Sequence, residues 1–90
     1  MKSTYRLRLY VTGGTHSAEL AIAVLRKLTI MLAGRIQSQV IDVLLHPELF
    51  FDNGLQMTPL FVRECPDPVV RLRGEISEPQ QLIRLLRLEP

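Results

Sequence analysis

The sequence contains one cysteine, no tryptophan and no long apolar run. A single cysteine cannot form a disulfide within the chain, and dithiol redox chemistry, which needs two thiols, is excluded. No apolar run approaches the roughly 18 to 20 residues that span a bilayer, and residues 1–4 lead directly into a strand pattern instead of a signal peptide. We therefore expect a cytoplasmic protein with no membrane segment.

Charge and aromatic residues are also sparse. Charged residues make up 22% of the 90 residues, aromatic residues 6%, and the net charge is +2. Residues 1–40 carry a net charge of +5 and residues 41–90 a net charge of −3. Nucleic-acid-binding domains usually concentrate basic residues at higher density, often with aromatics for base stacking, so we expect no nucleic-acid partner. The hydrophobic content of 47% predicts a folded chain, with one domain over residues 1–90.

The first half has the pattern of a β-α-β unit. Residues 5–11 alternate polar and apolar side chains before turning wholly apolar, which predicts a strand. Two glycines interrupt the pattern, and Thr15 or Ser17 is available to cap a helix over about residues 18–32. Residues 36–45 are rich in β-branched side chains and predict a second, central strand. A unit of this length predicts parallel strands with a right-handed crossover.

The expected helix has a wide apolar face. Its buried stripe is predicted from residues that recur every three or four positions: Ala18, Ala21, Leu25, Leu28 and Leu32. Further apolar residues widen this face, namely Ile22, Val24, Ile30 and Met31. They indicate either a helix sunk deeply into the core or a contact between subunits.

The second half predicts a short segment, two strands and a helix. Residues 47–55 form a short helix or an irregular segment, and residues 60–64 and 69–73 form an antiparallel hairpin. Residues 82–88 form a helix, preceded by a capping box in which Ser77 and Gln80 lie three apart. The resulting order, βαβαββα with a mixed four-stranded sheet, is thioredoxin-like. Pro59, just before the third strand, lies where that fold places a cis-proline.

Catalytic groups are missing from the places where this fold would use them. A thioredoxin-like oxidoreductase needs a reactive cysteine at the start of the first helix, but residues 13–18 contain none. Cys65 lies beyond the third strand without a resolving partner. His16 and His46 lack the spacing of a zinc site, and the two glycines before the helix lack the remainder of a nucleotide-binding motif. We expect no enzyme activity, no metal and no cofactor.

Recognition of another macromolecule is therefore the leading class of function. Phe50 and Phe51 are adjacent and cannot readily share one helical face, so they indicate either core packing with loop cover or a partner contact. Three arginines near the predicted hairpin, Arg63, Arg71 and Arg73, form a basic patch or occupy ordinary solvated strand positions.

At this point the sequence resembles the KaiB family of bacterial clock proteins, over about residues 5–88. The matching segments are Leu9-Tyr10-Val11-Thr12-Gly13 with Thr15, Val40-Ile41-Asp42-Val43-Leu44 with Pro47 and Leu49, Thr58-Pro59, Pro68-Val69 with Arg71, and Gly74-Glu75-Ile76-Ser77.

The resemblance implies a non-enzymatic regulator that binds the ring ATPase KaiC, helps sequester KaiA and modulates KaiC phosphorylation. It implies a homo-oligomer, a dimer or tetramer, and two folds: the thioredoxin-like form and a tetrameric ground state ordered βαββααβ. The switch between them would fall at Gly74 and Glu75. Contacts with the ATPase would fall on Pro47, Glu48, Leu49, Phe50, Phe51, Asp52, Asn53 and Arg63.

Two other functions are compatible with the sequence, one because it departs from the family pattern and one because related proteins share the fold. The lysine that the family carries before the Thr-Pro pair is absent here, so a KaiB-like paralogue that serves another KaiC-like ATPase, in stress adaptation, is as plausible as a clock component. A second alternative is a thioredoxin-like sensor domain of a SasA-type signalling system. For the fold, the capping box and the spacing of Arg84 and Arg87 favour the thioredoxin-like form over the rearranged tetramer.

Overall fold

A computed structural model describes residues 5–51 and 57–89 of the chain. The described residues form four strands and three helices in the order βαβαββα, as the sequence predicts. The elements are β1 (Tyr5–Val11), α1 (His16–Met31), β2 (Ile36–Asp42), α2 (Pro47–Phe51), β3 (Leu60–Cys65), β4 (Val70–Arg73) and α3 (Pro79–Leu85).

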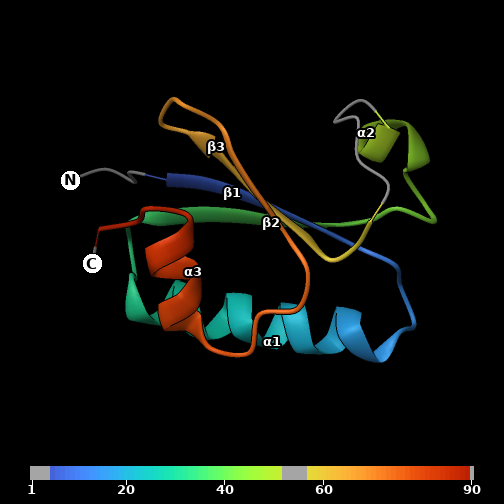
Figure 1. Ribbon diagram of the computed structural model, residues 1–90, viewed down its shortest axis with the longest axis horizontal. Helices are drawn as coiled ribbons and strands as arrows, with labels where there is room; N and C mark the ends of the chain where they lie inside the picture. The colour runs from blue at the N-terminus through green and yellow to red at the C-terminus, as the bar shows by residue number, and fades with distance from the viewer. Residues whose placement is uncertain (1–4, 52–56, 90) are drawn as a thin grey trace.

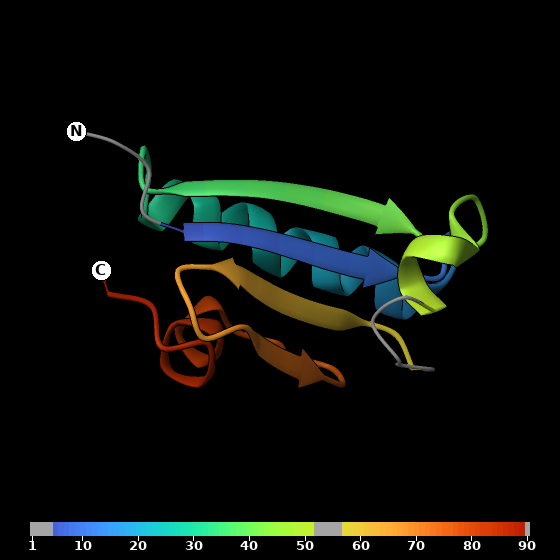
Figure 2. The ribbon, with the colours of Figure 1, turned by 90° about the horizontal axis from the view of Figure 1, so that it is seen from above.

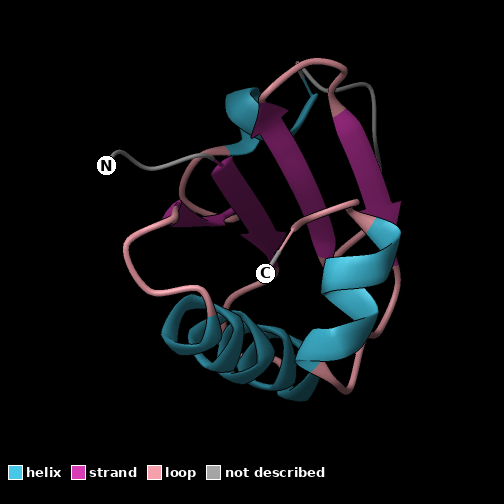
Figure 3. Ribbon diagram, turned by 90° about the vertical axis from the view of Figure 1, so that its left-hand side faces the viewer, coloured by secondary structure: helices cyan, strands magenta, loops and turns pink. Residues whose placement is uncertain are grey.

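The strands form one mixed sheet in the order β2-β1-β3-β4. β1 pairs in parallel with β2, whereas β3 is antiparallel to both β1 and β4. Helices α1 and α3 lie together on one face of the sheet (Figures 1 and 3). The short helix α2 lies on the other side, near one end of the strands (Figures 1 and 2). Among the described residues, α1 and α3 cover one face of the sheet, here called the covered face, whereas the short α2 lies over one end of the other, here called the open face.

The second strand is an edge strand, so the prediction of a central one is wrong. β3 returns antiparallel on the far side of β1, which leaves β2 with a single neighbour. Residues 37–40 of β2 are all exposed. The sequence signal came from β-branched residues around Ile41, but that side chain is the only buried one in the strand. β2 also ends at Asp42, three residues before the predicted boundary.

Helix α1 begins slightly earlier than expected because Thr15 is the residue that caps it. The Thr15 hydroxyl accepts a hydrogen bond from the Ala18 N–H at 3.1 Å and donates one to the Thr12 carbonyl at 2.7 Å. The predicted stripe of five residues is buried, together with Val24. Ile30 is 76% exposed. Only part of the wide apolar face of α1 is thus buried within the chain.

Two clusters form the core, one on each face of the sheet. The larger cluster joins β1 and Phe61 to α1, α3 and Ile76 on the covered face. The smaller one, on the open face, contains Tyr10, Ile41, Leu60 and Val62, with Val43 and Leu49 packed against it.

The capping interaction of α3 is shifted by one residue from the predicted pair of Ser77 and Gln80. The Gln81 side chain accepts hydrogen bonds from the backbone N–H groups of Ser77 and Glu78, each at 3.1 Å. Pro79 occupies the first turn, where its missing N–H costs nothing and its fixed φ suits a helix. The helix therefore starts at Pro79 and its third residue, Gln81, makes the contact.

Candidate partner-binding surface

A tight turn after β2 positions the segment that the sequence identified for partner binding. The Asp42 carboxylate oxygen Oδ1 accepts hydrogen bonds from the N–H groups of Gly13 (3.1 Å) and Leu44 (2.9 Å). The Asp42 carbonyl accepts from Leu45 and His46, both at 3.0 Å. A side chain at position 13 would collide with this carboxylate, because an added Cβ would overlap with Oδ2. Asp42 thus ends the strand and directs the chain toward α2.

Leu49 attaches α2 to the open face of the sheet. Its side chain is half-buried and packs against the open-face cluster around Tyr10 and Leu60. Glu48 is exposed and lies 3.8 Å from the His46 imidazole, a surface contact that stabilises the helix little. Leu45, just before the helix, is 72% exposed. The turn and α2 therefore present apolar and acidic side chains outward on an anchored backbone.

The predicted contact residues from 47 to 51 share this helix. Pro47 and Glu48 are exposed and Leu49 is half-buried against the sheet, while Phe50 and Phe51 continue the helix backbone. Asp52 and Asn53 lie outside the described residues. Sequence reasoning missed Leu44 and Leu45, because it extended β2 over them. The signal that was available is Asp42, a residue type whose side chain commonly accepts a backbone hydrogen bond two residues on.

Arg63, also predicted to contact a partner, faces inward. It is 5% exposed, and one guanidinium nitrogen, Nη1, donates to the carbonyls of Leu86 (3.1 Å) and Arg87 (3.2 Å). Nη2 donates to the Pro68 carbonyl at 2.8 Å. These bonds join β3 to the end of α3 and to the loop before β4. The structure therefore does not bring Arg63 together with the predicted contact residues of α2, and its guanidinium bonds these carbonyls instead.

The three hairpin arginines therefore do not form one patch. Arg63 pairs with Val70 across the hairpin, whereas Arg71 pairs with Val62, and successive residues of a strand point to opposite faces. Arg71 and Arg73 accordingly lie exposed on the open face, opposite to Arg63.

The cis-proline segment adjoins the region expected to switch folds. The Thr58–Pro59 peptide bond is cis, and the Thr58 hydroxyl lies 2.8 Å from that of Thr12. The Pro59 carbonyl accepts a hydrogen bond from Gly74 at 3.1 Å. Gly74 has a φ of +104°, which glycine adopts readily, and Glu75 beside it is exposed. A small cavity of about 150 Å³ separates this segment from α1.

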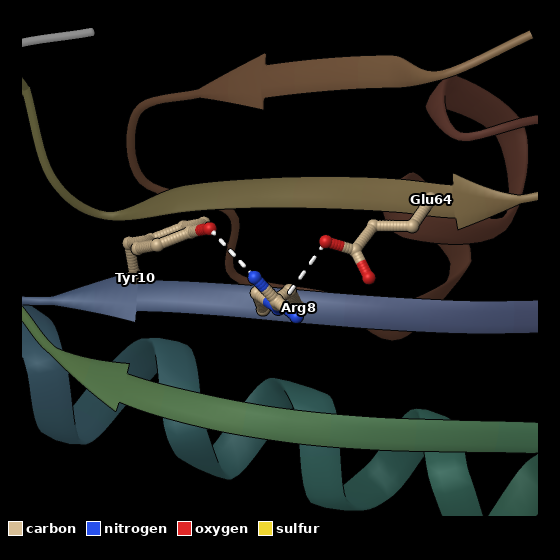
Figure 4. A network of polar contacts seen from close by, with 3 residues as sticks. All are labelled: Arg8, Tyr10 and Glu64. Carbon is tan, nitrogen blue, oxygen red and sulfur yellow. Dashed lines mark hydrogen bonds and ion pairs between the residues drawn. The ribbon is translucent and has the colours of Figure 1, made fainter. Parts of the chain in front are cut away.

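The open face also carries a polar network on the two middle strands (Figure 4). Arg8 donates to the Tyr10 hydroxyl at 3.3 Å and forms a 3.2 Å ion pair with Glu64. The hydrogen bond to Tyr10 raises the pKa of Arg8, partial burial opposes this effect, and the charge of Glu64 adds to it. Arg8 is therefore held as a cation at a fixed place on the sheet.

Reactive groups are separated in this arrangement. Cys65 is exposed and opposite Arg6, at the start of β1, whereas α1 begins after the far end of that strand, about 20 Å away. Within residues 5–51 and 57–89 no three metal-binding side chains come together. In the same residues, no helix is both long and apolar enough to cross a bilayer. The geometry offers surfaces for binding, and the described residues show no assembled reaction centre.

The fold and these surfaces define a thioredoxin-like domain without a cysteine at the start of its first helix. Two solved structures have the same fold: the N-terminal domain of Synechococcus elongatus SasA (21% identity, TM-score 0.75, 99% of this chain and 89% of that one) and thioredoxin-2 of a malaria parasite (17% identity, TM-score 0.83, 99% and 86%).

The chain belongs to the KaiB family, since the model of the KaiB domain matches residues 8–88. It is 34% identical over 83 residues to the circadian clock oscillator protein KaiB of Prochlorococcus marinus, covering 91% of this chain and 71% of that protein. It is 32% identical to the protein of the same name from Synechococcus elongatus, covering 91% and 81%.

Proposed function

We propose that this chain is a non-enzymatic KaiB-type regulator that binds a KaiC-type ring ATPase and modulates its phosphorylation, either in a clock or in stress adaptation. Family membership supports a role in a Kai system, because the relatives are circadian clock oscillator proteins. The likeness to the SasA domain is one of fold and does not favour a sensor role. Binding of KaiA and self-association into a dimer or tetramer are further parts of this proposal.

The observation that carries the proposal is the exposed apolar turn beside an anchored α2. Hydrophobic surface of this kind is costly in water unless another macromolecule covers it. Leu44 and Leu45 are exposed, and Leu49 holds the adjoining helix to the sheet. The proposed contact surface comprises Leu44, Leu45, Pro47, Glu48, Leu49, Phe50 and Phe51, together with Asp52 and Asn53.

The test is capture of a KaiC-type ATPase on the immobilised protein, with ATP and with ADP. We expect retention of the ATPase in one nucleotide state. Leu45→Glu should lower the captured amount about tenfold or more, because it places a charge in an apolar interface. Ile30→Glu is the matched control, since Ile30 is equally exposed but lies on α1. Equal losses in both variants, or no capture of any co-occurring ATPase of this type, would contradict the proposal.

Phe50 and Phe51 are tested separately, by replacing both with alanine. Loss of capture by a variant with an unchanged circular dichroism spectrum would support their place in the contact. Undiminished capture would remove them from it. The phosphorylated fraction of the ATPase, followed over time with and without the regulator, measures the proposed modulation.

The proposed switch between folds centres on Gly74 and Glu75. Circular dichroism and sedimentation together test which form is populated in solution. The thioredoxin-like order predicts that the last segment is helical, as it is in α3 of this structure. A tetramer in which residues 79–85 are extended would mean that the rearranged form dominates.

A further inference from the structure

The open face of the sheet gathers arginines that are distant in sequence. Strand pairing places Gln39, Arg8, Val62 and Arg71 side by side across the four strands. The neighbouring row is Ile41, Tyr10, Leu60 and Arg73. Arg6 precedes Arg8 by two residues on β1 and therefore shares its face. Four arginines, two on β1 and two on β4, thus flank the buried middle of β3.

Among the described residues, the four strands carry one acidic side chain on this face, Glu64, and α2 beside it carries the exposed Glu48. Glu64 is held by Arg8, at the point where the pairing of β1 and β3 shifts register between Arg6 and Leu7. Leaving aside the four arginines and Glu64, the 11 basic and nine acidic residues of the chain reduce to seven and eight. The positive net charge of the whole chain is therefore concentrated on the open face.

The spacing of these arginines matches an extended polypeptide. Alternate residues of a strand lie roughly 7 Å apart on one face, so Arg6 and Arg8 repeat at that interval, as do Arg71 and Arg73. An extended partner presents alternate side chains at the same interval. Carboxylates at such positions suit arginine, whose planar guanidinium donates two parallel hydrogen bonds to a carboxylate.

Single-stranded nucleic acid would match the charge equally well but not the remaining surface. Sequence-tolerant binding of single strands depends on aromatic side chains on which bases stack. The aromatic residue on this part of the sheet, Tyr10, is completely buried, and its hydroxyl is bound by Arg8. A shallow hollow of about 310 Å³ is lined by Arg6, Arg8 and the Glu64 that pairs with Arg8, and by Gln37 and Gln39, whose amide groups can bond a peptide backbone.

We propose that the open face of the sheet docks an extended acidic polypeptide segment of a partner protein, with carboxylates at alternate positions. Arg6, Arg71 and Arg73 are exposed on this face, whereas the charge of Arg8 is paired with Glu64 in the middle of the sheet. The docking surface adjoins α2 but is distinct from it, and the proposal does not depend on which ATPase the chain binds.

The experiment measures fluorescence anisotropy of a labelled decapeptide of alternating glutamate and threonine, titrated with the intact protein at low salt. We expect saturable binding that weakens as salt increases. Arg6→Gln combined with Arg73→Gln should weaken binding about tenfold. The matched control combines Arg26→Gln with Arg84→Gln, exposed arginines of α1 and α3 that remove the same charge. That control should stay within about twofold.

Three results would overturn the proposal. One is absence of saturable binding, and another is an equal loss in both double variants, which would reveal attraction to net charge alone. The third is tighter binding of a ten-nucleotide oligothymidylate than of the acidic peptide. Amide chemical shifts of the unmodified protein give a readout that needs no variant. The peptide should perturb β1 and β4 on the open face, and perturbation confined to other elements would contradict the proposal.

Discussion

The two faces of the sheet use the same residue type in opposite ways. On the covered face, Arg63 is buried beneath the end of α3 and donates hydrogen bonds to three backbone carbonyls. On the open face, Arg71 and Arg73, eight and ten residues further along the chain, lie exposed. A buried guanidinium is stable only when polar partners replace water, whereas an exposed one keeps its hydration. The comparison separates an arginine buried within the fold from arginines exposed at its surface.

The largest expected difference between regions comes from packing. Leu28→Ala removes a completely buried side chain between α1 and the sheet, and should lower the free energy of unfolding by about 2–5 kcal/mol. Leu45→Ala, in the exposed turn before α2, should change it by less than about 0.5 kcal/mol. Urea unfolding followed by circular dichroism measures both. A comparable loss from Leu45→Ala would mean that the turn is covered in solution.

The arginine comparison itself should give the next largest effect. Arg63→Ala leaves the carbonyls of Leu86, Arg87 and Pro68 without their donor, and should destabilise the protein by about 2–4 kcal/mol. Arg73→Ala, on the open face, should cost less than about 0.5 kcal/mol. If the two variants unfold at the same urea concentration, the two faces do not differ in the way described.

The smallest expected effect concerns the network of Arg8, Tyr10 and Glu64. Tyr10→Phe keeps the buried ring but removes the hydroxyl that Arg8 contacts, which should cost about 0.5–1 kcal/mol. The arginine keeps its ion pair with Glu64, so the loss is limited to the hydrogen bond with the hydroxyl. Thermal unfolding at low and high salt measures the loss. A loss several times larger would indicate that the network organises the open face.

Local sequence patterns predicted an element well where residues close together in the sequence determine it. The buried stripe of α1 follows from a helical period that no other element alters, and Thr15 is a residue type that caps helices wherever the chain can bend. The hairpin of β3 and β4 follows from their short connection. Errors arose at boundaries, where a single side chain competes with the backbone, as Asp42 does at the end of β2 and Gln81 at the start of α3.

The candidate contact segment was predicted from family resemblance. The exposed turn before it and the faces on which the nearby arginines lie were not predicted. Leu44 and Leu45 alone do not distinguish an exposed apolar turn from the end of a strand, and the local signal for the turn is Asp42 before them. Arg63, Arg71 and Arg73 looked alike in the sequence, since alternation along a strand gives two faces without saying which one the helices cover. The network of Arg8 with Glu64 joins residues 56 positions apart, which no local pattern predicts.

By itself, the sequence determined the order of the elements, the family and the presence of a single cysteine, because these depend on residue type and spacing along the chain. Tertiary structure decided that β2 lies at the edge, that Arg63 is buried, and that four arginines of β1 and β4 share the open face. These outcomes depend on which strand pairs with β1 on each side and which face the helices cover. Such choices are made by long-range packing, to which every element contributes at once.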